Sequence, residues 1–184
     1  DTTAGQTMVT NAVNALAAEG ATQVDLGMNM AQSILNSNPV PAGELRNRVV
    51  VVFTDGAPTS SNGFEKKVAN DAISTSNSIK KDTGATVYSV GVFAGANASS
   101  AGIEPARDLN QGNNSLPAAS NWFMQNLSNN NGTPQIPSYY LSASDADTLN
   151  SIFQQISDQI ETGGSSTTLG EETVIKDIVA PAFT

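Results

Sequence analysis

The chain has 184 residues, which suffices for one domain with a substantial buried core. Its net charge is −9 and only 14% of its residues are charged, which argues against nucleic acid and anionic membrane surfaces as partners and suits a divalent cation. The absence of cysteine and histidine excludes most zinc sites, thiol catalysis and a Ser-His-Asp triad. Its apolar runs are far shorter than a membrane span, so we expect no membrane insertion.

The first quarter of the chain predicts two helices, and a strand follows them. Apolar residues at helical spacing indicate helices over 6–18 and 24–35. The run Val49–Thr54 (VVVVFT) is short, β-branched and aromatic. Such a run is typical of a strand that is buried on both faces at the centre of a parallel sheet.

A carboxylate stands directly after this strand. Asp55 is followed by Gly56 and then by Pro58, a combination that places the carboxylate on a tight turn where a bound group can come close. In parallel sheets, ligands bind at the carboxyl ends of the strands. Asp55 is therefore a candidate binding residue, and a plain turn-capping role is the alternative.

The next segment alternates a helix with a strand. A helix is predicted over 64–81, Gly84 ends it, and a second strand of the buried kind follows over 86–93. This alternation predicts right-handed βαβ units, and hence an α/β fold with a Rossmann-like parallel sheet flanked by helices. In the helix, the inward positions are Val68, Ala72 and Ile79, and the outward positions are Lys66, Lys67, Lys80 and Lys81.

A long connection separates this unit from the last strand and helix. The segment 95–137 is low in charge and rich in Asn, Ser, Gly and Pro, so we expect an irregular insertion, broken by an amphipathic stretch over 122–127. An insertion of this length is typical of an elaboration over a ligand face. Its Trp-Phe-Met sequence either forms an aromatic platform or anchors the insertion to the body. A strand over 138–142 follows, and Ser144 is expected to cap a helix over 145–160.

These elements form one expected domain over 1–162. The remainder, 163–184, is expected to form a linker over 163–170 and one or two terminal strands from Thr173 onward.

Three sequences together resemble the von Willebrand factor A domain. VVVFTDGAPT is preceded by GATQVDLGMNMAQSIL and followed by TVYSVGVFAG, and the resemblance covers about Ala4 to Ile160. The sequences NWFMQNLSNNNG and VIKDIVAPAFT are similar to A domains of surface adhesins and pilus-tip proteins of Firmicutes, where the second leads into a stalk module. In such stalks lysines form isopeptide bonds, but a solvated edge-strand lysine is the expected role of Lys176. The resemblance implies the C-terminal two-thirds of the domain, because its first strand has no counterpart here.

The resemblance also implies a metal-ion-dependent adhesion site. The family takes its metal ligands from a DxSxS turn, a Thr and an Asp; by position, Thr22 matches the Thr and Asp55 matches the Asp. The DxSxS turn has no match, since the nearest string, Asp1–Gly5, lacks the second hydroxyl. Mg²⁺, or Mn²⁺ or Ca²⁺ in its place, should therefore be held weakly. Taken alone, Thr22 would be a helix N-cap and Asp25 a first-turn acid.

The family implies a bacterial, extracellular cell-surface adhesion module without enzymatic activity that binds a protein or matrix ligand. One alternative is a structural pilus or cell-wall module with a vestigial metal site, whose partners are other pilus subunits or the missing N-terminal segment. Another is an intracellular A domain serving an ATP-driven machine such as a metal chelatase. Without the family's first strand, Val49–Thr54 would present a bare apolar edge, so we expect a preparation of these residues to be unstable or oligomeric.

Overall fold

The computed structural model describes residues 3–15, 21–44 and 46–163, and every structural statement below refers to these residues. The predicted terminal strands and Lys176 lie outside them. In chain order the elements are α1 (Thr3–Asn14), α2 (Val24–Ser37), β1 (Val49–Thr54), α3 (Lys66–Thr83), β2 (Thr86–Gly91), α4 (Leu116–Leu127), β3 (Tyr140–Ser142) and α5 (Ala146–Gly163).

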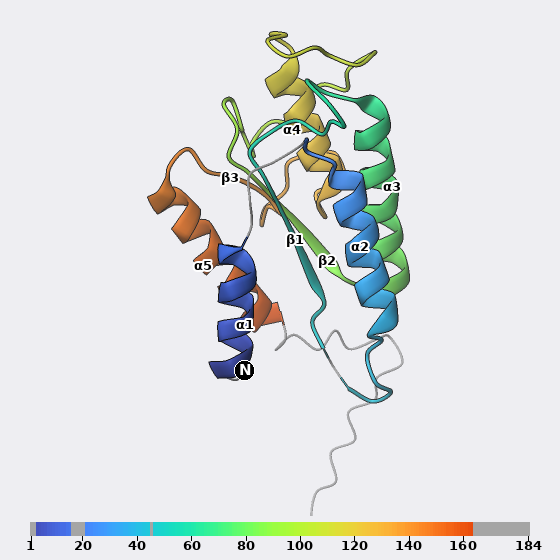
Figure 1. Cartoon of the computed structure of the whole chain (residues 1–184), viewed down its shortest axis with the longest axis vertical. Helices are drawn as coiled ribbons and strands as arrows, with labels where there is room; N and C mark the ends of the chain where they lie inside the picture. The colour runs from blue at the N-terminus through green and yellow to red at the C-terminus, as the bar shows by residue number, and fades with distance from the viewer. Residues whose placement is uncertain (1–2, 16–20, 45, 164–184) are drawn as a thin grey trace, which may run out of the picture.

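The sheet is parallel and has the order β1-β2-β3. Strand β1 pairs with β2 from Val49 opposite Thr86 to Thr54 opposite Gly91. Figure 1 shows α2, α3 and α4 on one side of the sheet and α5 on the other. The predicted α/β fold is therefore confirmed, and it follows from right-handed βαβ units whose helices α3 and α4 share one face.

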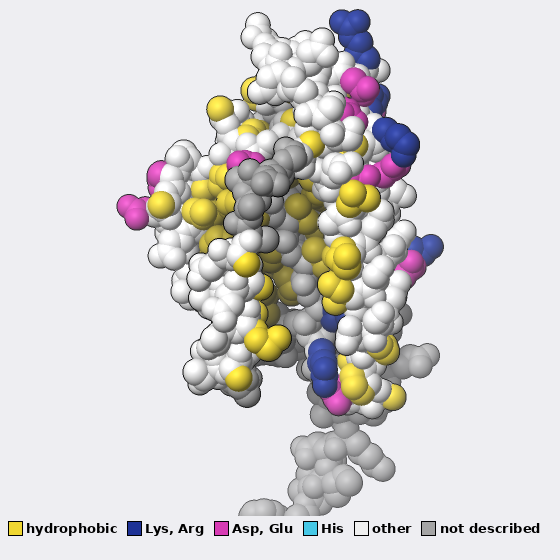
Figure 2. Space-filling view, viewed as in Figure 1, with side chains coloured by type: hydrophobic (Ala, Val, Ile, Leu, Met, Phe, Trp, Pro, Cys, Tyr) yellow, Lys and Arg dark blue, Asp and Glu magenta, His cyan; other side chains and the backbone are white. Residues whose placement is uncertain are grey.

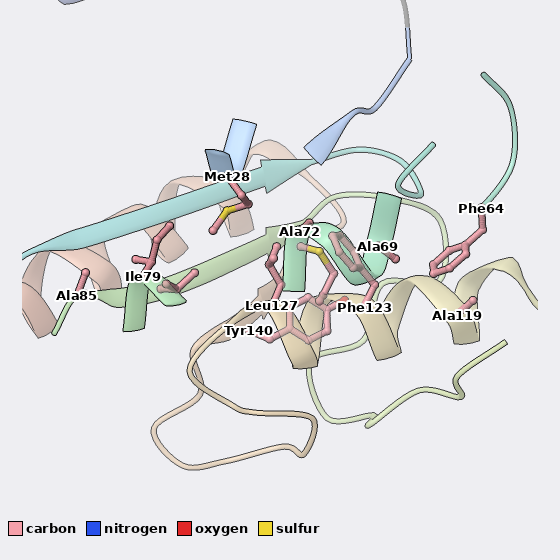
Figure 3. Packing of buried hydrophobic residues seen from close by; sticks show 12 residues of the cluster. Met28, Phe64, Ala69, Ala72, Ile79, Ala85, Ala119, Phe123, Leu127 and Tyr140 are labelled. Carbon is pink, nitrogen blue, oxygen red and sulfur yellow. The ribbon is translucent and has the colours of Figure 1, made fainter. Parts of the chain in front are cut away.

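The larger core lies between the sheet and the helices α2, α3 and α4. Phe123 and Leu127 of α4, Tyr140 of β3 and Ile79 of α3 are completely buried, and Met28 of α2 joins them. Figure 3 shows Phe123, Leu127 and Tyr140 gathered together beneath the strands. Burying each large apolar side chain contributes about 1.5–3 kcal/mol, so this face supplies much of the fold's stability.

The smaller core lies on the opposite face, under α5. Ile152 and Ile156 are buried there against Tyr88 and Val90 of β2. Phe153, which belongs to the same apolar stripe in the sequence, is 46% exposed, and its ring lies 6.5 Å from that of Phe53. Phe153 follows Ile152 directly and therefore points about 100° away from it around the helix axis, which puts Phe153 at the margin of this core.

Strand β1 is an edge strand of the described sheet, as expected without the family's first strand, but it is not buried on both faces as its composition predicted. Val51 is 40% exposed and Phe53 is 50% exposed, whereas β2 is buried along nearly its whole length. The run of valines could not show this difference, because a strand's burial depends on which partners cover its faces.

The insertion 95–137 contains a regular helix, so its predicted irregularity is wrong over Leu116–Leu127. Helix α4 is the crossover between β2 and β3, and the predicted amphipathic stretch is its second half. Its buried face includes the amides of Asn121 and Gln125, which donate hydrogen bonds to loop carbonyls such as those of Gly95 and Ala98. The buried Phe123 and the half-buried Trp122 pack on the larger core, which supports the anchoring interpretation.

Lys80 is half-buried rather than outward-facing. Its ammonium donates hydrogen bonds to the Ser128 carbonyl at 3.0 Å and to the Asn131 side chain at 3.1 Å, just beyond the end of α4. Burial lowers the pKa of Lys80 to about 8. The side chain therefore joins α3 to the end of α4.

Helix α5 is capped by Asp145 and not by Ser144 as expected. The Asp145 carboxylate accepts a hydrogen bond from the Thr148 amide at 2.7 Å, and the Ser144 hydroxyl donates to the same carboxylate. The hydrogen bonds from Thr148 hold the pKa of Asp145 below its usual value. A carboxylate competes well for this position because it also interacts with the helix dipole.

Helix α1 buries none of its side chains among the described residues. Met8, Val9 and Val13 are between 58% and 74% exposed. The segment 24–35 is helical as predicted, but of its apolar residues only Met28 is buried. None of the helices in the described part of the chain is long and apolar enough to cross a bilayer.

Candidate functional site

A pocket of about 640 Å³ lies at the carboxyl ends of β1 and β2. Thr22 and Asp55 both line it, so the structure brings the two sequence-predicted metal ligands to one place. The other walls come from the loop after β1, the residues that follow β2, and the insertion before α4. In parallel sheets generally, ligands bind at the carboxyl ends of the strands, where this pocket lies.

Thr22 is held in the pocket by the turn that follows β1. Its carbonyl accepts a hydrogen bond from the Thr59 amide at 3.0 Å. A Cβ added to Gly56 would lie 3.4 Å from the Thr22 hydroxyl oxygen, an ordinary van der Waals contact, so Gly56 and the Thr22 side chain are direct neighbours. The N-cap residue of α2 is Gln23 and no side chain caps that helix end, so the capping role expected of Thr22 taken alone is wrong.

Asp55 is exposed on the turn that Thr54 closes. The Thr54 hydroxyl accepts a hydrogen bond from the Gly56 amide at 3.2 Å and donates one to the Gly56 carbonyl at 3.0 Å. The Thr54 side chain thus makes the hydrogen bonds that stabilise this turn. Asp55 is exposed and lines the pocket.

Three hydroxyl residues beside Asp55 are organised by Glu65. Its carboxylate accepts hydrogen bonds from the hydroxyls of Thr59 (3.1 Å), Ser60 (2.9 Å) and Ser61 (3.2 Å). The Ser60 hydroxyl is the main cause that holds the pKa of Glu65 below its usual value, so Glu65 is ionised at neutral pH. We did not identify this cluster from the sequence; the run Thr-Ser-Ser closely followed by Glu was the available signal.

The insertion supplies the far wall of the pocket, as expected of an elaboration over a ligand face. Gln111, Asn113 and Asn114 contribute exposed amides, and Phe93 and Leu116 contribute apolar surface. The Asn113 side-chain oxygen accepts a hydrogen bond from the Ser115 amide at 2.9 Å, which orders the loop at the start of α4. The pocket therefore combines hydrogen-bonding groups with a small apolar floor.

Asp25 lies outside the lining of the pocket and belongs to the first turn of α2, as its alternative interpretation predicted. One of its carboxylate oxygens is buried and makes no hydrogen bond within the described residues. The pKa of Lys67 is raised mainly by its ion pair with Asp71 and to a smaller degree by Asp25. Asp25 therefore attracts Lys67 of the neighbouring helix α3 electrostatically.

The pocket contains the type of oxygen ligand that a hard divalent cation requires. Thr22 and Asp55 offer a hydroxyl and a carboxylate, the oxygen ligands that Mg²⁺ prefers, and water completes such sites. Among the residues that the structure describes, no group of three or more acidic, histidine or cysteine residues is positioned to hold a metal. In the string Asp1–Gly5, the described residues belong to α1 and do not follow a strand.

The family model described as von Willebrand factor type A domain matches residues 1–155. No curated protein and no solved structure matches the chain. The match covers every element of the described sheet and both residues of the candidate metal site.

Proposed function

This chain belongs to the von Willebrand factor type A family, and from that premise we propose that it is a surface adhesion module that binds a protein or matrix ligand. Domains of the family generally take part in adhesion and protein interaction. The observation that carries the proposal is the pocket shared by Thr22, Asp55 and the inserted loop. This pocket offers one carboxylate, several hydroxyl and amide groups, and apolar surface to a macromolecular ligand.

Thr22 and Asp55 would hold Mg²⁺, or Mn²⁺ or Ca²⁺ in its place. A bound divalent cation supplies a positive charge with an open coordination position, which accepts a carboxylate from the partner. The exposed amides of Gln111, Asn113 and Asn114 would then donate hydrogen bonds to polar groups that flank this carboxylate. The cation also offsets the repulsion between an acidic partner and a chain of net charge −9.

The proposal places the protein outside the cell, on a bacterial surface. The resemblance of its insertion and its C-terminal sequence to adhesins and pilus-tip proteins of Firmicutes supports this location, as does its richness in Asn, Ser, Thr and Gly with few Lys and Arg. We assign no catalytic residue and propose no enzymatic activity.

The second candidate is a structural pilus or cell-wall module in which the metal site is vestigial. It is favoured by the single carboxylate in the described lining of the pocket and by the absence of a larger ligand cluster in that part of the chain. In this case the partners would be other pilus subunits, and the pocket would be a solvent-filled groove.

The two candidates differ in their response to Mg²⁺. For the adhesion module, calorimetric titration should give a saturable signal that is lost in Asp55→Asn and retained in Asp82→Asn, a control carboxylate that is exposed on α3. Binding to a panel of immobilised matrix proteins should also be abolished by a chelator. If Mg²⁺ gives no saturable signal and chelation leaves matrix binding unchanged, the adhesion site is contradicted and the structural module is favoured.

A further inference from the structure

The loop before α4 is fastened to the start of α3 by backbone hydrogen bonds between residues far apart in the sequence. The Phe64 amide donates to the Leu109 carbonyl at 2.8 Å, and the Leu109 amide donates to the Phe64 carbonyl at 2.9 Å. The two residues thus form an isolated antiparallel bridge. Figure 1 shows this loop at the end of the molecule where α3 and α4 begin. The bridge holds the loop just before residues 111–114, the wall segment of the pocket.

The same loop caps α3 through Asp108. The Asp108 carboxylate accepts a hydrogen bond at 2.8 Å from the amide of Lys66, the first residue of α3. Glu65, the N-cap residue, makes no capping hydrogen bond with its side chain. A carboxylate in this position satisfies a helix amide that lacks a partner within the helix, and it interacts favourably with the helix dipole. The Lys66 ammonium also lies 3.3 Å from the Glu104 carboxylate, and Figure 2 shows acidic and basic side chains gathered over this end of α3.

Gly63 allows the loop to come this close. Its φ of 84° lies in the left-handed region that favours glycine. A Cβ added there would lie 2.0 Å from the Leu109 carbonyl oxygen and 3.0 Å from backbone atoms of Asn110. Because these neighbours are backbone atoms, no rotation of a side chain could relieve the overlap. A side chain at position 63 would therefore displace the loop from α3.

We propose that Asp108 and Gly63 are positioning residues of the candidate pocket, which dock the loop on α3 and thereby fix the wall segment relative to Asp55. The two walls of the pocket meet at the start of α3. Glu65 organises the hydroxyl groups beside Asp55, and the next residue, Lys66, receives the contact from Asp108. This inference rests on the function proposed above, because it assigns a role in that pocket.

The wall segment is short and is anchored at both ends. The bridge at Leu109 holds one end, and at the other end the Leu116 amide, at the start of α4, donates a hydrogen bond to the Asn113 carbonyl at 3.0 Å. The entropy cost of ordering such a segment falls on folding and not on binding. Release of the anchor at Leu109 should therefore lower the fraction of molecules that present the wall segment to a ligand.

Hydrogen exchange tests the role of Asp108. Loss of an N-cap contact shifts a local opening equilibrium by about fivefold, so the Leu109 amide should exchange about fivefold faster in Asp108→Ala. Asp108→Asn keeps a side-chain oxygen that can accept the Lys66 amide and should preserve the slow exchange. Exchange that is unchanged in Asp108→Ala, or that is equally fast in both variants, would overturn the role of Asp108.

Gly63→Ala tests whether docking of the loop sets the position of the wall segment. Substoichiometric Mn²⁺ should broaden the amide signals of 111–114 in the native chain, and Gly63→Ala should lose this broadening while that of Gly56 remains. Gly84→Ala is the matched control, because Gly84 also has a positive φ, of 65°, but an added Cβ would meet no atom within 4 Å. The control should keep the native pattern. Broadening of 111–114 that persists in Gly63→Ala would overturn the proposal.

Failure of this proposal differs from failure of the proposed function. If Mn²⁺ broadens no signals around Asp55 in the native chain, the cation site is wrong. Exchange at Leu109 and the amide chemical shifts of 111–114 need no cation, and they then decide whether the loop is docked as proposed. If Gly63→Ala does not fold, the two Asp108 variants decide. Localised Mn²⁺ binding with unchanged Leu109 exchange in Asp108→Ala would overturn the positioning role alone.

Discussion

Strands β1 and β2 have similar sequences and opposite surroundings. Both are short and rich in valine, yet β2 is buried along nearly its whole length, while β1 exposes Val51 and Phe53. The difference comes from their neighbours, because in the described sheet β2 lies between two strands and β1 has one. A strand's composition therefore indicates that it belongs to a core, but the fold decides how completely that core covers it.

The two regions also differ in how their polar groups are satisfied. Next to β2, the Ser89 hydroxyl donates to the Met124 carbonyl at 2.9 Å, and the Val87 amide donates to the Asn129 side chain at 2.7 Å. These contacts tie the sheet to α4 and to the loop behind it. The outer side of β1 has no such contacts within the described residues, so we expect the β2 region to be the stable part of the fold and β1 the weaker edge.

The largest expected loss of stability comes from a substitution in the core beside β2. Phe123→Ala removes a completely buried ring and should lower the free energy of unfolding by about 3–5 kcal/mol. Phe53→Ala removes a half-exposed ring on β1 and should lower it by less than about 1.5 kcal/mol. Urea unfolding at low protein concentration measures both. Equal losses for the two substitutions would show that β1 is as well packed as β2.

Replacing two glycines by alanine, one before β2 and one in α2 beside β1, should change the stability in opposite directions. Gly84 leads into β2 with φ of 65°, and an added Cβ there would meet no atom within 4 Å, so Gly84→Ala should destabilise through backbone strain alone, by about 1 kcal/mol. Gly27 lies within α2 and is equally unobstructed. Gly27→Ala should therefore stabilise by about 0.5–1 kcal/mol. Thermal or urea unfolding of the pair checks both signs, and destabilisation by Gly27→Ala would contradict the described position of α2.

The last effect is a pH dependence carried by Lys80, and it is confined to alkaline solution. Burial lowers its pKa to about 8 in the folded chain, whereas an unfolded lysine titrates near about 10.4. Between these values the unfolded chain binds more protons, so the contribution of Lys80 to stability should increase as pH rises through this window. Lys80→Met should remove that increase, and Lys81→Met, at an exposed position, should retain it. Identical pH slopes for the two variants would refute the burial of Lys80.

Most elements could be predicted because their signals are local. Strand β1 has the predicted bounds, and Gly84 ends α3 as expected, since its left-handed conformation suits glycine. Helix α4 was only half recognised, because Asn121 and Gln125 occupy buried positions where the periodicity calls for apolar residues. Their partners are carbonyls of the preceding loop, and no local pattern specifies such contacts.

The candidate site was predictable in part. Asp55 was predicted as a binding residue from its place at the end of a strand and Thr22 through the family resemblance, and the structure places both in one pocket. Glu65 with its hydroxyl partners, and the amides of the insertion, were missed because they come together only in the folded chain. Their alignment depends on where the loop before α4 returns to the sheet, a long-range feature that residue spacing does not encode.

Paramagnetic broadening by Mn²⁺ tests the central claim most directly, namely that Thr22 and Asp55 form one cation site. In an amide NMR spectrum of the chain, substoichiometric Mn²⁺ should broaden the signals of Thr22, Gly56 and Thr59 first. Asp55→Asn should abolish this selectivity. Broadening that is spread over the exposed carboxylates of the chain, or that is unchanged by Asp55→Asn, would contradict the claim.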